Sequence, residues 1–539
     1  MDFSDVLQLA TRPRNVAFVL IGSFIFYALY RVILYPRFFS PLRFVPGPPI
    51  DGVILGHFYD IIHSEGGAIQ GEWTKKYGPA VRAVGPVGRE RLILLKPEVL
   101  HKILVTDWVD YPRPKFMRNI LGLSAGYGLL TVTGNEHRQM RKAMNPAFAL
   151  PNLMAQTDSY FDSIETLVKI LRSQIARNTT LSHGMILPVY EWMSKVTLDI
   201  ICDTAFGYHS NSLLNPNNEL TEAYEDLISL QSGVNLAVLS SLVAIPGMPA
   251  FLASEMGYRY RHVFACLKLL APVKTFIGSL HQIRRISREM LREKLADTAV
   301  DAADMATKKD IMSLLVRARK GETKGYQLSD EALVDQVLTF LGAGHETTAS
   351  GLSWTLWLLA NDPRAQSKLR DEVSPIFAVN GRPDYRVLKD LKMLDCVIME
   401  SLRLLPPVPM TLREAGKSDW IDGVYVPKGT LFHIPLRAIN TWPEVWGPDA
   451  EHFRPERWLD LPEKYNSTFS MMSFITGPHA CIGKTMSISE MKAVLAAMIT
   501  NFEFAPAYAG QVAKPTSAIT MKPDDNMPLL VTPIHKLVV

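Results

Sequence analysis

The sequence contains little cysteine for its size, with four residues among 539. The four are widely separated and include no Cys-x-x-Cys pair, so the chain is neither a disulfide-stabilised scaffold nor a protein with a cysteine-rich zinc site. Few, unpaired thiols are typical of a reducing compartment. Between its proline-rich N-terminal segment and its last cysteine, the sequence has no internal repeat and no low-complexity tract. This region is therefore expected to form a packed body.

An excess of charge of either sign is also missing. Lys and Arg number 57 and Asp and Glu number 53, which gives a formal net charge of +4. Nucleic-acid-binding domains usually carry a strong basic excess, so nucleic acid is excluded as the main partner. The length exceeds the usual range of a single domain. The motifs described below nevertheless spread from Arg141 to Cys481, so one large fold must contain most of the chain.

A long apolar run lies near the N-terminus. From Val16 to Tyr35 the chain carries one charge, Arg31, and about 20 helical residues span roughly 30 Å, enough to cross a bilayer. A cleaved signal peptide would have a shorter apolar core and small residues at the cut, so the bulky residues 30–35 favour a retained membrane anchor. Arginines on the C-terminal side, including the one inside the run, outnumber those on the N-terminal side, which favours a cytosolic body. These are Arg31, Arg37 and Arg43 against Arg12 and Arg14.

The segment Phe474–Gly483 carries the strongest chemical signal. Its single thiol, Cys481, is framed by Gly477 and Gly483, which lack a Cβ and would let the backbone turn tightly against a flat macrocycle. A helical pattern from residue 482 to residue 499 follows, so the sulfur is expected near a helix N-terminus, which stabilises a thiolate. This environment suits an axial ligand of haem iron. His479 is expected at a haem propionate and Phe474 on the sulfur side of the ring. The other cysteines, Cys202, Cys266 and Cys396, are expected to be small core residues.

This segment resembles the ligand loop of the cytochrome P450 superfamily, Phe-x-x-Gly-x-(Arg or His)-x-Cys-x-Gly. His479 stands where most members carry arginine, so its pairing with a propionate is expected to weaken above the imidazole pKa of about 6.5. The version Gly-Pro-His-Ala-Cys-Ile-Gly-Lys looks like that of fungal members that oxidise triterpenoids or aromatic xenobiotics. Three further motifs of the family occur in the expected order.

The first motif is Ala343–Thr348, inside a helical pattern that runs from Ser329 to Asn361. Small residues at 342–344 predict a local opening of the helix that leaves room for dioxygen. The resemblance implies that Thr347 and Glu346 form an acid–alcohol pair that delivers protons during oxygen activation. The alternative is a solvated glutamate and a threonine that bonds its own helix.

The second and third motifs are Glu400–Arg403 and Phe453–Trp458. Glu400 and Arg403 lie three apart on a predicted helix and can form an ordinary ion pair. The resemblance implies that Arg457 joins them in a buried structural triad. It also places Arg413 and Arg141 at the haem propionates. His137 replaces the tryptophan of the Trp-x-x-x-Arg motif, and whether it contacts haem stays open. Arg138 and Lys142 are either solvated or dock an acidic electron donor.

The resemblance implies a mainly α fold with a small β part, preceded by an N-terminal transmembrane helix. Valine- and isoleucine-rich stretches at 81–95 and 420–433 predict the small sheets. We expect a membrane anchor at 1–36 with its span at about 16–35, a proline-rich hinge at 37–50 and a haem-thiolate monooxygenase domain at 51–539. The expected cofactor is haem b, with O2 and NADPH-derived electrons as co-substrates. Expected partners are NADPH-cytochrome P450 reductase and cytochrome b5, at the endoplasmic reticulum membrane, with one span and a cytosolic catalytic domain.

Regions that line the substrate pocket in this family are largely apolar here, which favours a lipophilic substrate. They are 116–130, 406–410 and 518–520, and the expected pocket residues are Phe116, Ile120, Ala343, Val408 and Ile519. A terpenoid or sterol-like molecule is favoured. The alternatives are a broad-specificity hydroxylase of aromatic xenobiotics or fatty acids, and a reductase-independent haem-thiolate isomerase. The apolar stretch Val234–Ala253 is broken by Pro246, Gly247 and Pro249. It predicts a loop that touches the bilayer, or alternatively a piece of buried core.

Overall fold

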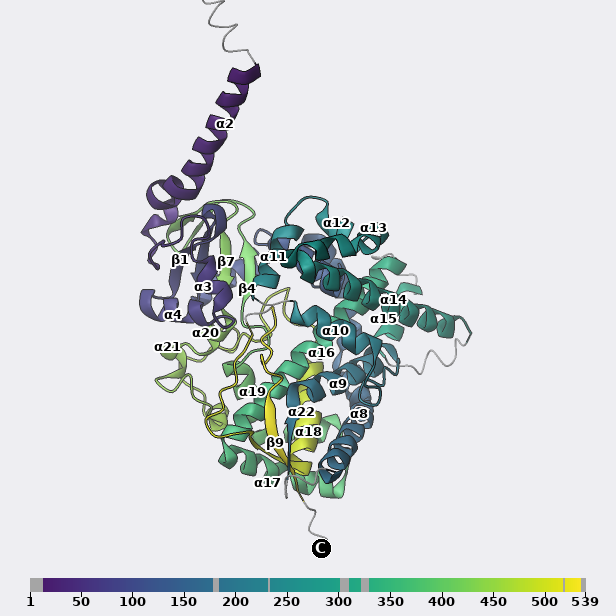
Figure 1. Cartoon of the computed structure of the whole chain (residues 1–539). Coiled ribbons are helices and arrows are strands. Elements are labelled where there is room, and N and C mark those ends of the chain that lie inside the picture. The colour runs from purple at the N-terminus through teal and green to yellow at the C-terminus, as the bar shows by residue number, and fades with distance from the viewer. Residues whose placement is uncertain are drawn as a thin grey trace, which may run out of the picture.

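The computed structural model describes residues 13–177, 184–230, 233–300, 310–320, 329–516 and 519–534. Figure 1 shows a mainly helical body from which one apolar helix projects. This helix, α2 (Pro13–Leu29), continues through a π-helical segment, η1 (Tyr30–Phe39), and then a 3-10 turn, η2 (Pro41–Phe44). The predicted fold class, mainly α with a small β part, is confirmed.

The N-terminal helix is longer than the predicted span. It runs from Pro13 to Phe39, is long and apolar enough to cross a membrane, and none of its most apolar stretch is buried in the body. Residues 1–12, which the predicted anchor includes, lie outside the described residues. The junction with the body is polar. Arg82 bonds the carbonyl of Pro36, and the Glu90 carboxylate accepts from Arg82 and from Ser40. The end of the apolar helix is therefore held against the sheet.

Small sheets flank the helices. The largest has the order β1-β2-β7-β4 and consists of β1 (Ala80–Val84), β2 (Glu90–Leu94), β7 (Leu431–Ile434) and β4 (Thr411–Glu414). Only the β2/β7 pair is parallel. A second, antiparallel sheet joins β3 (Met185–Pro188), β9 (Pro528–Pro533) and β8 (Phe502–Pro506). A ribbon of β5 (Asp419–Ile421) and β6 (Val424–Val426) completes the β part. The stretches predicted to form sheets do so.

The helical body is built around α16 (Asp330–Asn361), which Ser329 caps by accepting a hydrogen bond from the amide of Ala332. Asp362 then caps α17 (Pro363–Val379). These bounds agree with the predicted helix, because the cap and Pro363 are local signals. Buried leucine, valine and phenylalanine side chains of α16 join two large core clusters.

Further helices surround α16 and complete the body. They are α3 (Phe58–His63), α4 (Ala68–Tyr77), α5 (Pro97–His101), α6 (Lys115–Ala125), α7 (Gly134–Met144), α8 (Leu150–Arg177), α9 (Val189–Ile201), α10 (Glu219–Ser229), α11 (Gly233–Val243), α12 (Met248–Ala253), α13 (Glu255–Arg259), α14 (Ala271–Val300), α15 (Ile311–Lys320), α18 (Tyr385–Asp390), α19 (Lys392–Leu404), α20 (Leu436–Asn440), α21 (Pro443–Trp446) and α22 (Lys484–Asn501).

The stretch 234–253 is helical, so its prediction as a loop is wrong. Its two helices, α11 and α12, are separated where Gly247 adopts a positive φ of 84°. Leu239, Val243 and Leu252 are buried in the core, whereas Val234 and Ile245 are exposed. The proline and glycine interrupt the helix as expected, but α11 and α12 each bury part of their surface in the core. In Figure 1, α11 and α12 lie at the end of the body from which α2 projects.

Candidate active site

A single large cavity brings most of the predicted site residues together. Its volume is about 510 Å³ and its wall is mainly apolar. The ligand-loop residues Phe474, His479, Cys481 and Gly483 line it, as do His137, Arg141, Glu346 and Thr347 and the predicted pocket residues Phe116, Ile120, Ala343, Val408 and Ile519. Residue 518 lies outside the described residues. Gly477 and Arg413 are not among the lining residues, and their positions are described below.

The ligand loop presents its sulfur to the cavity at the start of α22. The amide of Cys481 donates to the carbonyl of Phe474 over 3.0 Å, which closes the loop. Gly477 has a φ of +76°, and a Cβ there would lie 2.2 Å from the carbonyl oxygen of Leu104. This glycine is thus required for close packing against Leu104, and it does not line the cavity. A Cβ on Gly483 would meet only the Cys481 sulfur, at 4.0 Å.

Opposing effects act on the Cys481 thiol. The sulfur accepts hydrogen bonds from the amides of Gly483 and Lys484, and these bonds and the Arg141 charge lower its pKa. Burial raises the pKa more strongly, so the net shift is upward. The thiol faces the internal cavity, which makes its atoms accessible although it lies deep in the protein. Metal binding requires the thiolate and would displace the proton.

Five cationic or imidazole side chains gather beside the ligand loop. The rings of His137 and His479 lie 3.9 Å apart between centroids. Arg113 Nη1 lies 3.4 Å from His479 Nδ1 and donates to the carbonyl of Leu130 over 2.9 Å. Arg141 Nη1 donates to the carbonyl of Ala480 over 2.5 Å. Arg413, on β4, is close enough for its charge to lower the pKa of both imidazoles. Its Nη1 donates to the Leu412 carbonyl over 2.8 Å.

This group, Arg113, Arg141, Arg413, His137 and His479, forms no ion pair with a carboxylate among the described residues. Arg413 Nη2 and His137 Nδ1 are buried without a hydrogen-bond partner. Burial, followed by Arg113, lowers the pKa of Arg413 well below its usual value. Buried charges are stable only when paired, so a bound group that brings its own carboxylates is required. Haem has such carboxylates and a metal for Cys481, and the residues present fit it.

The surroundings of His479 lower its pKa, and its pairing with a haem propionate stays a prediction. Burial, then Arg113, His137, Arg413 and Arg141, hold its pKa well below the usual range. Burial likewise lowers the pKa of His137 to about 4. Both imidazoles are therefore neutral at pH 7 in this structure and can offer hydrogen bonds, while the arginines supply the charge. Arg113 was missed from the sequence because an arginine between two prolines has no distinctive local signal.

The acid–alcohol pair lies on α16, and Thr347 and Glu346 each form a hydrogen bond with a different residue. Thr347 Oγ1 donates to the Ala343 carbonyl over 2.7 Å, which is the alternative in which a threonine bonds its own helix. Glu346 is 7% exposed and accepts a hydrogen bond from Thr520, so it is not a solvated residue. The predicted opening of the helix at 342–344 is wrong, because α16 is continuous there. A Cβ on Gly344 would lie 2.8 Å from Ile201, so this glycine permits close packing of α9.

Burial raises the pKa of Glu346 to about 7, while the Thr520 hydrogen bond and the Lys522 charge act in the opposite direction. A carboxyl group with such a pKa is present in both protonation states near neutral pH, which suits proton transfer. Thr520 was expected only as part of the pocket lining at 518–520. Its hydrogen bond to Glu346 and the charge of Lys522 were not predicted, because only the tertiary fold places this C-terminal segment beside α16.

Replacement of Glu346 by glutamine should change how stability depends on pH. The folded-state pKa of about 7 exceeds the ordinary value of 4.5. The folded state therefore binds more protons between these values, and wild-type stability falls as pH rises through that window. Glu346→Gln cannot ionise, so its stability relative to wild type should rise by about 3 kcal/mol from pH 4.5 to above pH 7.

The measurement is the difference in melting temperature between variant and wild type across that pH range. Thr520→Val removes the hydrogen bond that lowers the pKa, so it should move the wild-type transition to higher pH. Parallel pH profiles for wild type and Glu346→Gln would contradict a raised pKa.

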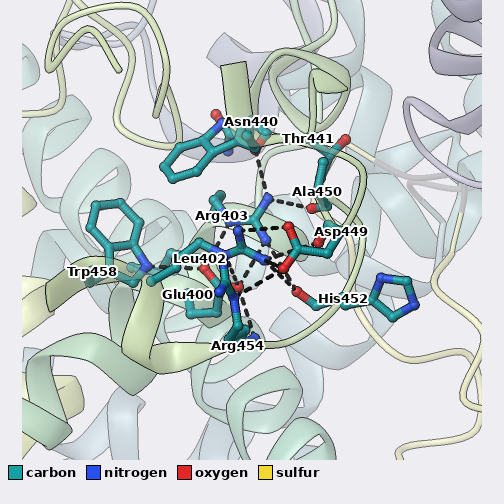
Figure 2. Close-up of polar contacts among 12 residues, drawn as sticks. Glu400, Leu402, Arg403, Asn440, Thr441, Asp449, Ala450, His452, Arg454 and Trp458 are labelled. Atoms are coloured by element: carbon teal, nitrogen blue, oxygen red, sulfur yellow. Dashed lines mark hydrogen bonds and ion pairs between the residues drawn. The ribbon is translucent and has the colours of Figure 1, made fainter. Parts of the chain in front are cut away.

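The members of the predicted structural triad contact one another, and Figure 2 shows Glu400 and Arg403 within the surrounding polar network. Glu400 is fully buried and accepts from Arg403 Nε and Arg457 Nε, each over 2.8 Å, and from Trp458 Nε1 over 3.0 Å. Arg403 Nη1 also donates to the carbonyl of Asn440 over 3.0 Å. The Asn440 side chain in turn accepts from the amide of Met472 and donates to Ser473, directly before Phe474. A continuous hydrogen-bond network thus connects the triad to the loop that carries Cys481.

Comparison with known proteins agrees with this site. The family model described as Cytochrome P450 matches residues 46–530. Cytochrome P450 monooxygenase 205 of Postia placenta is 32% identical, and the alignment covers 92% of this chain and 94% of that protein. Cytochrome P450 monooxygenase sphH of Aspergillus fumigatus is 31% identical, with 97% and 94% covered. Cytochrome P450 monooxygenase 128 of Postia placenta is 32% identical, with 94% and 95% covered.

Proposed function

The chain belongs to the cytochrome P450 family of oxidoreductases, and from this premise we propose that it is a membrane-anchored haem-thiolate monooxygenase that hydroxylates a lipophilic substrate. The observation that carries the proposal is the unpaired cationic group beside Cys481, which requires a ligand with its own carboxylates next to a thiol. Haem b would be held by the Cys481 sulfur, with its propionates among Arg113, Arg141, Arg413 and the two imidazoles. When bound, it supplies the activation of O2 and the transfer of one oxygen atom to the substrate.

The chain's own residues contribute proton handling and substrate binding. Glu346 holds a proton at its carboxyl oxygen at the wall of the cavity, and Thr520 fixes the orientation of that carboxyl. The Thr347 hydroxyl lies on the next residue of α16 and also faces the cavity. We infer that Glu346 passes protons into the cavity and recovers them on the side of Lys522. The apolar wall, which includes Phe116, excludes water and orients the substrate.

A buried acid with a pKa near 7 favours monooxygenation over the alternative of a reductase-independent haem-thiolate isomerase, because an isomerase needs no supply of protons. A terpenoid or sterol-like substrate suits the apolar cavity, and aromatic xenobiotics or fatty acids also suit it. Electrons are proposed to come from NADPH-cytochrome P450 reductase, with cytochrome b5 as a second donor. Arg138 and Lys142 support this, because they are exposed on α7, the helix that also carries Arg141 beside the ligand loop.

The apolar helix 13–39 supports an anchor in the endoplasmic reticulum membrane with the catalytic domain in the cytosol. Several large apolar residues are also exposed in the segment after α12, and they support contact of this face with lipid. They are Met256, Tyr260, Val263, Leu267 and Leu269. A lipid-dissolved substrate would then enter from the bilayer.

The test is a carbon monoxide difference spectrum of the reduced, full-length protein, followed by turnover with NADPH and reductase. We expect the thiolate-ligated signature, and product only when reductase, NADPH and O2 are all present. A library of terpenoids, sterols, aromatic compounds and fatty acids, screened for the low-spin to high-spin shift, identifies the substrate class. Product formed from a peroxide without reductase, and none with it, would favour the isomerase instead.

A further inference from the structure

A second polar group lines the cavity at the four-stranded sheet. Arg91 lies on β2 and His433 on β7, and both line the cavity. The two strands are parallel, with Arg91 opposite Leu431 and Ile93 opposite His433. Side chains two residues apart on a strand share a face of the sheet, as do residues in register on neighbouring strands. Arg91 and His433 therefore face the same side.

Arg91 is a buried cation without a counter-charge. It is 8% exposed, and its Nε has no hydrogen-bond partner. Among the described residues no carboxylate pairs with its guanidinium, and the charged group that affects its pKa is another cation, Arg89. Burial and Arg89 lower the pKa to about 10, so Arg91 stays protonated at neutral pH. An unpaired buried charge of this kind is costly.

The guanidinium is held in place by its surroundings. It lies 5.5 Å from the centre of the Phe58 ring, and a Cβ on Gly85 would lie 2.5 Å from its Nε. The glycine thus provides the space in which the guanidinium sits. Its position is therefore fixed before any ligand binds.

Neighbouring polar atoms are also unsatisfied. His433 is 3% exposed, and neither ring nitrogen has a hydrogen-bond partner. Burial and the Arg91 charge keep its pKa well below the usual range, so the ring is neutral and offers one N–H. Gln70 also lines the cavity, and its Oε1 has no partner. Buried polar groups are normally hydrogen-bonded, so three such residues lining one cavity indicate a polar ligand.

This group is distinct from the cationic group at Cys481. The charges that lower the pKa of His479 are those of Arg113, Arg413 and Arg141, with His137, and Arg91 is not among them. Burial lowers the pKa of Arg413 most, and the charge that adds to this effect is that of Arg113. The charge of Arg91, in turn, adds to burial in lowering the pKa of His433. The haem carboxylates assigned above therefore leave Arg91 and His433 free.

We propose that Arg91 and His433 bind the carboxylate of a lipophilic acid, which makes the substrate of this enzyme an amphipathic carboxylic acid with its apolar part in the cavity. This inference rests on the proposed monooxygenase function and specifies its substrate class. A guanidinium can bind a carboxylate through two parallel hydrogen bonds, and the imidazole N–H adds a third. One carboxylate balances the single charge of Arg91, whereas a phosphate would bring close to two negative charges. A neutral substrate would leave the buried cation unpaired.

The test compares two probes of the same chain length, dodecanoate and 1-dodecanol, on the full-length holoenzyme in detergent at about pH 8, where the acid is ionised. Affinities are measured by isothermal titration calorimetry. Arg91→Gln should weaken dodecanoate binding about tenfold to a hundredfold, because a charged hydrogen-bonded pair is lost. Its affinity for 1-dodecanol should stay within about twofold of wild type, since the apolar contacts remain.

Arg89→Gln is the matched control. It removes the same charge two residues away, but Arg89 is half-exposed and lies 3.5 Å from Glu414. Its affinity for dodecanoate should be unchanged. His433→Leu leaves Arg91 in place and should lose about tenfold or less for dodecanoate. This variant decides the question if Arg91→Gln does not fold.

Equal losses for both probes would mean that Arg91 shapes the cavity without binding an anion, and the proposal would fail. Unchanged dodecanoate affinity in Arg91→Gln and His433→Leu would overturn it as well. Binding is read without turnover, so it is independent of the proposed reaction. A selective loss of dodecanoate in a protein without the thiolate signature would retain the anion site and reject the monooxygenase.

Discussion

Replacement of Glu400 by alanine should prevent the chain from accumulating as a stable, haem-loaded protein. Glu400 is fully buried between Arg403 and Arg457, which are themselves 0% and 2% exposed. Its loss leaves two buried guanidinium groups with fewer partners, which typically costs about 3–5 kcal/mol. Folded domains are stable by only about 5–15 kcal/mol. The substitution is therefore expected to remove a large share of the free energy of unfolding.

The damage should extend to the ligand loop. Arg403 holds the Asn440 carbonyl, and the Asn440 side chain bonds Met472 and Ser473 just before the loop. Without Glu400 the Arg403 side chain loses both of its carboxylate hydrogen bonds. The segment that positions Cys481 should then become less ordered. We expect both a low yield of soluble protein and a low haem content per chain.

The measurement combines melting temperature, soluble yield and haem stoichiometry. Glu451→Ala is the matched control, because Glu451 forms an exposed ion pair with Lys75 at 2.5 Å. Exposed pairs contribute about 0–1 kcal/mol, so this variant should resemble wild type. If Glu400→Ala melts as the control does and binds haem fully, the triad does not support the fold as argued.

Replacement of Cys481 by alanine should remove the thiolate signature from the carbon monoxide difference spectrum completely. The sulfur at the cavity wall is the proposed ligand of the haem iron, and alanine offers no donor atom there. The loop itself should keep its fold, since its hydrogen bonds run through the backbone: Cys481 to Phe474 and Ala480 to Gly477. The arginines beside the loop are untouched, so part of the haem should still bind, with altered absorbance.

Cys266→Ala provides the control for removal of a thiol, because Cys266 is exposed. Its spectrum and haem content should match those of wild type. The loss in Cys481→Ala should be total, since one ligand atom is the origin of the signal. Persistence of the thiolate band in this variant would show that another residue binds the iron.

Local patterns in the sequence predicted the parts of the structure that are themselves local. Ser329 and Pro363 marked the two ends of the helical pattern around α16, because a cap and a proline act on their own turn of helix. The ligand loop could be predicted for the same reason, since its glycines and cysteine lie within ten residues. The break between α11 and α12 was visible at Pro246 and Gly247. The sequence did not show which faces of these two helices are buried.

The role of several residues depended on contacts between distant segments. Thr520 bonds Glu346 across 174 positions of the chain. Arg113 approaches His479 across 366 positions. Neither residue has a neighbouring motif that marks it. The lowered pKa of His479 has a similar origin, because burial and then charges from other segments, Arg113 first, act on its ring.

The sequence by itself determined the loop around Cys481, the apolar N-terminal helix and the helical class of the body, because each depends on residue types within a short window. Tertiary structure alone decided which charges remain unpaired. Burial and pairing are properties of the space between segments, and no spacing along the chain reveals that Arg91 lacks a carboxylate partner or that Glu346 has a pKa near 7. These two features add to what the motifs imply: the first bears on the substrate class and the second on proton transfer.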